Sequence, residues 1–294
     1  MSEEKDYKLR PMEIPLNDEF YERPFFAYGI FKKGQLAYSK ISDCVDNVIP
    51  DEIPRKMYIR DGVPVISSED DVNFTTKGDK IYFTDSYEAY GIISKTQPGN
   101  IYEWDTVLID DVLFNVIVTD NFKGCYPNRD KNRNYLDIYD GRKDPFFFKA
   151  TKFIRNELKA LDFEDDCSIF RIQMYYMLLW SAIDRYCSLK YDVSNYQGDY
   201  LDNLADDELF NEAFNIVDPR GRKAIHSSRN ASPLYFNRKR PNFIVNHYYT
   251  IRCNVVHRGK DPENNMSSLI ESLMDLLDIF DLMIRKAFDC PEDE

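Results

Sequence analysis

The first 120 residues alternate short apolar runs with turn residues, a pattern typical of β-strands. The runs are rich in aromatic and β-branched side chains, and Gly, Pro, Asn and Asp separate them. Because turns this short favour antiparallel neighbours, we expect a mostly antiparallel β-barrel or sheet over residues 1–120. The predicted strands are 25–28, 80–83, 87–93, 102–109 and 112–118.

A polar stretch, 121–145, follows these strands and contains Gly124, Pro127 and Gly141. Composition of this kind is typical of a connection between domains. We therefore interpret 121–145 as a linker and expect a second domain to follow it.

From residue 146 to 294 the apolar positions recur at three and four residues, the period of α-helices. Asp144 and Pro145 are a favourable helix opening, because an Asx side chain can cap a helix that proline then begins. Ser268 and Glu271 have the spacing of a capping box before a final amphipathic helix. The fold class that we predict is α+β, with an N-terminal β-rich domain and an all-α helical bundle over 146–294. Predicted helices cover 144–161, 167–191, 204–217, 244–258 and the segment that follows Ser268.

Charge is distributed unevenly along this chain of net charge −13. Between Pro219 and Lys260 there are ten Lys or Arg residues, no Asp or Glu, and all three histidines. Such a basic segment can be a solvated loop, or it can line a cleft that binds an anion such as a nucleic-acid phosphate. Composition alone leaves both alternatives open.

The cysteine spacing, the first residues and the apolar runs argue against a zinc protein, a secreted protein and a membrane protein. The six cysteines show no zinc-ligand spacing, and the first residues, MSEEKDYKLR, lack the apolar core of a signal peptide. No apolar run approaches the roughly 20 residues that span a bilayer. We expect a cytoplasmic protein with no metal, no cofactor and no membrane partner. Asp165-Asp166 and Asp206-Asp207-Glu208 lie where helices are predicted to begin, and acidic residues favour that end of the helix dipole.

The segment YYTIRCNVVHRGK, residues 248–260, carries the candidate chemistry. Arg252 and His257 are five residues apart on a predicted helix, with Asn254 between them, and Gly259 is predicted to end the helix. RNA cleavage by attack of the ribose 2′-hydroxyl needs a group that transfers protons near neutral pH and a cation for the charge that develops on phosphate. We expect His257 to be the acid or base, Arg252 the phosphate stabiliser and Asn254 an orienting group. The alternative is a histidine that only stabilises its own helix end.

Other residues are predicted to hold the RNA. Five basic side chains of the same region can neutralise phosphates, and a tyrosine can stack on a base. The predicted RNA-binding residues are Arg238, Lys239, Arg240, Arg258, Lys260 and Tyr248.

The helical half resembles the HEPN superfamily. The resemblance rests on an apolar helix (residues 175–186), a later helix with Arg, four to six residues and His (252–257), and a closing amphipathic helix. It implies a metal-independent endoribonuclease that leaves a 2′,3′-cyclic phosphate, often a toxin or antiviral-defence effector, with a homodimer that forms through this domain. Members commonly have Asn directly after the arginine, whereas this chain has Cys253. Non-catalytic HEPN proteins, which dimerise or regulate, are the alternative.

The stretch FFAYGIFKKGQL, residues 25–36, resembles the opening of the γ-glutamylcyclotransferase-like fold. The resemblance implies that Tyr28, Gly29 and Gly34 bind a small anionic ligand or a protein trigger. Active cyclotransferases carry a general acid/base Glu between later strands, and the corresponding stretch 94–101 has no carboxylate. We therefore expect a sensing or regulatory module, with a metabolite enzyme as the alternative.

Overall fold

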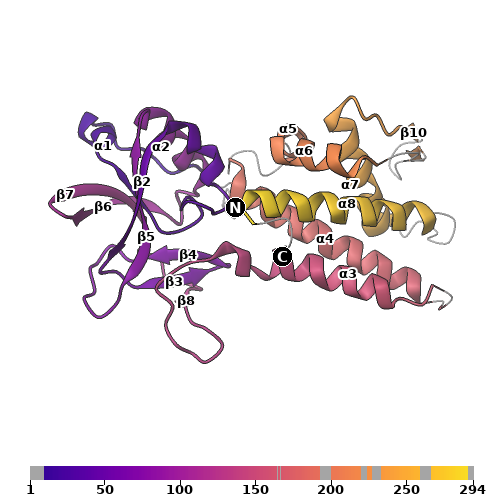
Figure 1. Ribbon diagram of the computed structural model, residues 1–294, viewed down its shortest axis with the longest axis horizontal. Helices are drawn as coiled ribbons and strands as arrows, with labels where there is room; N and C mark the ends of the chain where they lie inside the picture. Colours follow the sequence, from indigo (N-terminus) through magenta and orange to yellow (C-terminus); the bar gives the residue numbers. More distant parts are fainter. Residues whose placement is uncertain are drawn as a thin grey trace, which may run out of the picture. The chain divides into compact units, whose positions relative to one another are not determined.

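The computed structural model describes residues 10–163, 165, 167–192, 200–219, 224–226, 233–258 and 266–290. Contacts divide the chain into two compact units (Figure 1). The N-terminal unit comprises Met1–Gly141 with Leu189–Tyr196, and the helical unit comprises Arg142–Ser188 with Gln197–Glu294. The structure contains both the β-strands predicted for the first domain and the helices predicted for the second.

The N-terminal unit is built on a five-stranded sheet of order β2-β5-β1-β7-β6. β1 runs parallel to β7, and the other neighbouring strands are antiparallel. This sheet and a three-stranded sheet of order β4-β3-β8 remain separate, so the predicted alternative of a closed barrel is wrong. The strands are β1 (Phe25–Ala27), β2 (Val45–Ile53), β3 (Met57–Arg60), β4 (Val63–Ile66), β5 (Thr76–Phe83), β6 (Glu103–Ile109), β7 (Val112–Val118) and β8 (Tyr126–Pro127).

One predicted strand, 87–93, is a helix. It lies within α2 (Ser86–Thr96), which begins where the Asp85 side chain accepts a hydrogen bond of 2.9 Å from the Glu88 amide. Ala89, Tyr90 and Ile93 are buried, and their spacing is that of one helix face. The aromatic and β-branched residues that suggested a strand are therefore the apolar face of a capped helix. Three short helical segments complete this unit: α1 (Asp18–Glu22), η1 (Tyr38–Lys40) and η2 (Ser42–Cys44).

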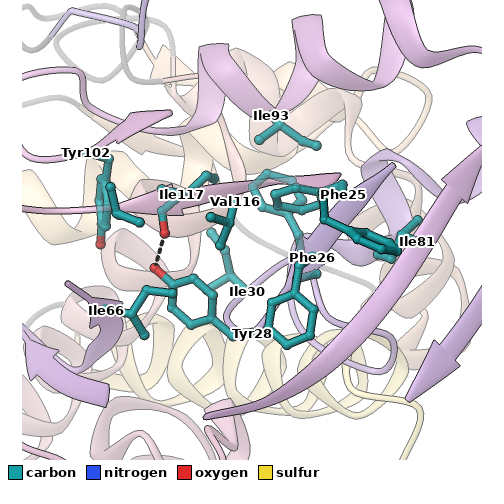
Figure 2. Packing of buried hydrophobic residues seen from close by; sticks show 14 of the residues in the cluster. Phe25, Phe26, Tyr28, Ile30, Ile66, Ile81, Ile93, Tyr102, Val116 and Ile117 are labelled. Atoms are coloured by element: carbon teal, nitrogen blue, oxygen red, sulfur yellow. Dashed lines mark hydrogen bonds between the residues drawn. The ribbon is translucent and has the colours of Figure 1, made fainter. Parts of the chain in front are cut away.

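The core of the N-terminal unit is centred on β1, whose three residues are all buried. Figure 2 shows Phe25 and Phe26 against Ile81 and Val116 from the neighbouring strands. A central strand that is covered on both faces consists of consecutive apolar residues. The sequence therefore predicted β1 well.

The stretch 121–145, predicted as a linker, contributes to both units. β8 pairs with β3, and the Gly141 amide donates a hydrogen bond of 2.8 Å to the Gln35 side chain, both within the N-terminal unit. Beyond Arg142, the Asp144 side chain accepts a hydrogen bond from the Phe146 amide and so caps the first helix of the helical unit, as predicted.

The described helices of the second unit match the predicted ones in most places. The predicted helix 204–217 is interrupted, because the Asp207 side chain caps a new helix by accepting a hydrogen bond of 2.9 Å from the Leu209 amide. Ser268 lies inside the last helix, so the predicted capping box does not mark its start. The elements are η3 (Gly141–Lys143), η4 (Pro145–Lys149), α3 (Ala150–Ala160), α4 (Ser168–Lys190), α5 (Tyr200–Asp206), α6 (Glu208–Val217), β9 (Ile225–His226), β10 (Pro233–Leu234), α7 (Pro241–Arg258) and α8 (Met266–Ala287).

α4 is the central helix of this unit. The Tyr186 hydroxyl donates a hydrogen bond of 3.1 Å to the Asp207 carboxylate at the start of α6. Arg185 forms a 3.1 Å ion pair with the buried Asp144 at the start of η4. These contacts fix α4 against its neighbours and set the positions of the side chains that it presents to α5 and α7. In the described residues, no helix combines the length and apolarity that crossing a membrane requires.

Candidate functional site around Arg252

α7 is anchored by the apolar stripe that the sequence predicted. Ile244, Tyr248 and Ile251 are buried at spacings of four and three residues. Burial of this stripe orients the remaining positions of α7, among them Tyr249 and Arg252, toward a second face of the helix. Arg252 lies one helical turn after Tyr249 on that face.

The Arg252 guanidinium lies over an aromatic ring. Its central carbon is 5.6 Å from the centroid of the Tyr249 ring, which is within the range of a cation–π interaction. The Arg252 Nε atom is buried and has no hydrogen-bond partner in the structure as described. Ion pairs between described residues of this unit use other cations, namely Arg155, Arg171, Arg185, Arg238, Arg285 and Lys286. Arg252 therefore keeps hydrogen-bonding capacity that the neighbouring described residues do not use.

Tyr249 is the point where three helices meet. Its ring packs edge-on against Trp180 of α4, at 5.5 Å between centroids, and against Tyr200 of α5, at 6.4 Å. Trp180 is buried, whereas Tyr249 and Tyr200 are partly exposed. The junction of α4, α5 and α7 thus holds the ring on which Arg252 rests.

A carboxylate of α4 belongs to the same junction. Burial raises the pKa of Asp184, while a hydrogen bond from the Tyr200 side chain and the charge of Arg252 act in the opposite direction. Burial also raises the pKa of Tyr200, and the charge of Asp184 adds to that effect. The Asp184 Oδ1 atom is buried without a hydrogen-bond partner among the described residues. The sequence analysis missed Asp184 because it is 68 positions from Arg252; its place one turn after Trp180 in an apolar helix was the available signal.

The remaining predicted catalytic residues are placed only in part. His257 belongs to the last turn of α7, but its side chain lies outside the described residues, as does that of Arg258; Lys260 lies outside them entirely. Asn254 is buried in the bundle with 8% of its surface exposed. Its predicted role as an orienting group stays a prediction.

Tyr248, predicted to stack on a base, is part of the core. Only 1% of its surface is exposed, and its hydroxyl donates a hydrogen bond of 3.3 Å to Asp275 of α8. The prediction is therefore wrong, because the spacing that places Tyr249 at the junction turns Tyr248 inward. Tyr249 is the partly exposed member of the pair.

Residues 238–240, which we call the basic segment, directly precede α7 and are exposed. Arg238 forms an ion pair with Asp218, and the Arg240 guanidinium lies 5.5 Å from the Phe243 ring centroid. Twelve residues separate Arg240 from Arg252, which corresponds to about 18 Å along a helix axis.

The predicted ligand loop of the N-terminal unit, residues 28–34, makes hydrogen bonds and packing contacts within that unit. The Tyr28 hydroxyl is buried and donates a hydrogen bond of 2.8 Å to the Ile117 carbonyl oxygen (Figure 2). A Cβ atom at Gly29 would meet Pro64 at 3.1 Å, and Gly34 has a φ of 72° that glycine adopts without strain. The Lys33 amide donates a hydrogen bond of 2.8 Å to the buried Asp79 carboxylate. Tyr28 is thus a core residue, and one amide of the loop already binds an internal carboxylate.

Two further features bear on the chemistry of the chain. In the part of the chain that the structure describes, no group of three or more His, Cys, Asp or Glu side chains is arranged to hold a metal ion. All six cysteines are free thiols. Asp207 caps α6 and the Asp165 side chain accepts a hydrogen bond from the Cys167 amide, so both acidic residues serve helix starts, as predicted.

Comparison with known proteins identifies no relative: no family model, no curated protein and no solved structure matches this chain.

Proposed function

We propose that the helical unit is an endoribonuclease that needs no metal ion and acts through Arg252 and His257. The observation that carries the proposal is the state of Arg252. Its guanidinium is held on the Tyr249 ring, its Nε atom has no described partner, and His257 follows five residues later in α7. An arginine in this state is suited to bind a phosphate oxygen through charge-assisted hydrogen bonds.

The reaction that fits these groups is attack of the ribose 2′-hydroxyl on the adjacent phosphorus. His257 takes or gives the proton, and Arg252 stabilises the charge that develops on the phosphate oxygens. The products are a 2′,3′-cyclic phosphate and a 5′-hydroxyl end. The resemblance to HEPN ribonucleases supports the same assignment and adds a homodimer in which two copies of the site lie close together.

The basic segment, residues 238–240, supplies sequence-independent affinity for the RNA backbone in this proposal. Exposed Lys and Arg side chains neutralise phosphates and release counterions. The N-terminal unit is proposed as a sensing module, because its loop at Gly29 resembles the ligand loop of cyclotransferases, whereas the stretch 94–101 lacks their catalytic carboxylate.

The direct test is incubation of the purified full chain with RNA in EDTA, followed by analysis of the fragment ends. We expect cleavage that persists in EDTA and leaves 2′,3′-cyclic phosphates. Arg252→Ala and His257→Ala should each abolish it, since general acid–base and electrostatic catalysis each contribute roughly 100-fold or more. The matched control is Arg155→Ala, which removes another partly exposed arginine of the helical unit and should leave cleavage unchanged. Loss of activity on chelation, or full activity of His257→Ala, would contradict the proposal.

A further inference from the structure

The chain that leads into α7 is held against the helical unit by an aromatic side chain. Phe236 packs edge-on against His247 of α7, at 5.0 Å between ring centroids, and its ring lies 6.1 Å from that of Phe214 in α6. The segment 235–240 is therefore attached to two helices. Side chains that point away from those helices are carried on a fixed backbone, as a binding surface requires.

A turn connects this segment to α7. The Arg240 amide donates a hydrogen bond of 3.1 Å to the Asn237 carbonyl oxygen, and the Asn237 side chain accepts another of 3.1 Å from the Lys239 amide. An asparagine at the first position is typical of such turns, because its side chain can bind the backbone two residues on. The three side chains of the basic segment are exposed around this turn.

Two exposed aromatic side chains flank the basic segment. Tyr235 is 65% exposed, because its neighbour Phe236 occupies the side that faces the bundle. Phe243 is 37% exposed and lies one helical turn before His247, the residue on which Phe236 packs. Both exposed rings therefore belong to the same part of the surface as residues 238–240.

The charges of this surface leave capacity for an anion. Arg238 is paired with Asp218, whereas Lys239 and Arg240 form no ion pair with a carboxylate that the structure describes. The Arg240 guanidinium instead lies 5.5 Å from the centroid of the Phe243 ring. Cations between exposed aromatic rings match the chemistry of a single nucleic-acid strand, whose phosphates are anionic and whose unpaired bases offer flat faces.

We infer that Tyr235, Phe243 and the basic segment form a stacking platform for single-stranded RNA, in which the two rings stack on unpaired bases. Duplex RNA fits this platform poorly, because its bases are paired inside the helix and only its backbone is left to contact. The platform adds a substrate class, unpaired RNA, to the proposed function, and the choice of RNA as the ligand rests on that function. Binding is independent of sequence, since every base has a π face.

The test measures binding of the full-length protein to 2′-deoxy oligonucleotides, which the proposed reaction cannot cleave. Three probes of one length are compared: a mixed-sequence single strand, a fully abasic strand and a duplex. The abasic strand keeps every phosphate and has no bases. The wild type should bind the mixed-sequence strand at least about 5-fold more tightly than the abasic strand, the lower end of what one base–aromatic stack contributes.

Four variants assign this difference to the two rings. Tyr235→Leu and Phe243→Leu keep an apolar side chain and should each weaken binding of the mixed-sequence strand by about 5-fold, because a stack is lost. Their affinity for the abasic strand and for the duplex should be unchanged. Tyr235→Phe keeps the ring and should bind as the wild type does. The matched control is Phe170→Leu, which removes a ring that is 58% exposed on α4 and should leave binding unchanged.

Failure of this inference and failure of the proposed function give different results. The leucine variants remove no phosphate contact, so the slope of log affinity against log salt should equal that of the wild type. If the wild-type chain binds single strands through the two rings but cleaves no RNA, the ribonuclease proposal fails and the stacking platform stands. Absence of binding, equal affinity for the abasic and mixed-sequence strands, or unchanged binding by both leucine variants overturns the platform, whatever the protein cleaves.

Discussion

The Tyr176 hydroxyl of α4 donates a hydrogen bond of 2.8 Å to the backbone carbonyl oxygen of Tyr248 in α7. The Tyr248 hydroxyl in turn donates to Asp275 of α8, so two buried tyrosines connect three helices of the helical unit. This connection fixes the rotation of α7 and hence the direction in which Tyr249 and Arg252 point.

Removal of these hydroxyls should destabilise the helical unit. Tyr176→Phe should lower the free energy of unfolding by about 1 kcal/mol, a typical net value for one hydrogen bond. Tyr248→Phe should cost about 1–3 kcal/mol, because it leaves the buried Asp275 carboxylate with one donor fewer. Chemical denaturation measures both, with the exposed Tyr235→Phe as a control that should change nothing.

Two glycines of the N-terminal unit should respond to alanine in opposite directions. A Cβ atom at Gly78 of β5 would lie 2.5 Å from the Ala27 carbonyl oxygen and 2.7 Å from the Phe26 ring, so Gly78→Ala should destabilise by about 1–3 kcal/mol. Gly91 lies inside α2, with nothing within 4 Å of its Cβ position, so Gly91→Ala should stabilise by about 0.5–1 kcal/mol. Equal effects in urea unfolding would mean that the packing around β5 is not as described.

The raised pKa of Asp184 predicts how stability depends on pH. Between the unfolded pKa of an aspartate, about 3.9, and its raised folded value, the folded protein binds more protons, so stability falls as pH rises. Asp184→Asn cannot titrate and should lose this contribution. The free energy of unfolding of Asp184→Asn minus that of the wild type should therefore increase as the pH rises from 4 to 7. A difference that stays constant across this range would show that folding does not shift the pKa of Asp184.

The basic segment should determine the salt dependence of RNA binding. Replacement of Arg238, Lys239 and Arg240 by Ser should weaken the binding of unrelated sequences alike and reduce the slope of log affinity against log salt by about 2, roughly 0.7 for each phosphate contact on a single strand. Fluorescence anisotropy at several salt concentrations measures this slope. Affinity that is unchanged at low salt would identify the segment as a solvated loop.

Subunit mixing should show whether two chains share the site. If the Arg252 and His257 side chains of two protomers meet across a two-fold axis, heterodimers of Arg252→Ala and His257→Ala chains retain one intact pair. Co-expression should then restore partial cleavage, although each variant alone is inactive. A mixture that exchanges subunits and stays inactive would contradict a shared site, as would full activity in a protein that is monomeric at the assay concentration.

The sequence by itself determined the elements whose signals are local. β1 and α4 were found because continuous or periodic apolar residues follow from burial, and Asp144 was recognised as a cap because capping involves only neighbouring residues. β2 was missed because most of its residues are partly or fully exposed, so it carries no apolar alternation. The helix α2 was mistaken for a strand because aromatic and β-branched residues suit both structures.

Only the tertiary structure decided the composition of the candidate site. Arg252 was evident from the motif, but its support by Tyr249 and the contacts of Tyr249 with Trp180 and Tyr200 arise from the packing of α4 and α5 against α7. The same packing turned Tyr248 into the core, although Tyr248 and Tyr249 are identical residues side by side in the sequence. Local patterns specify which residues form a helix, whereas long-range packing specifies which of its side chains meet.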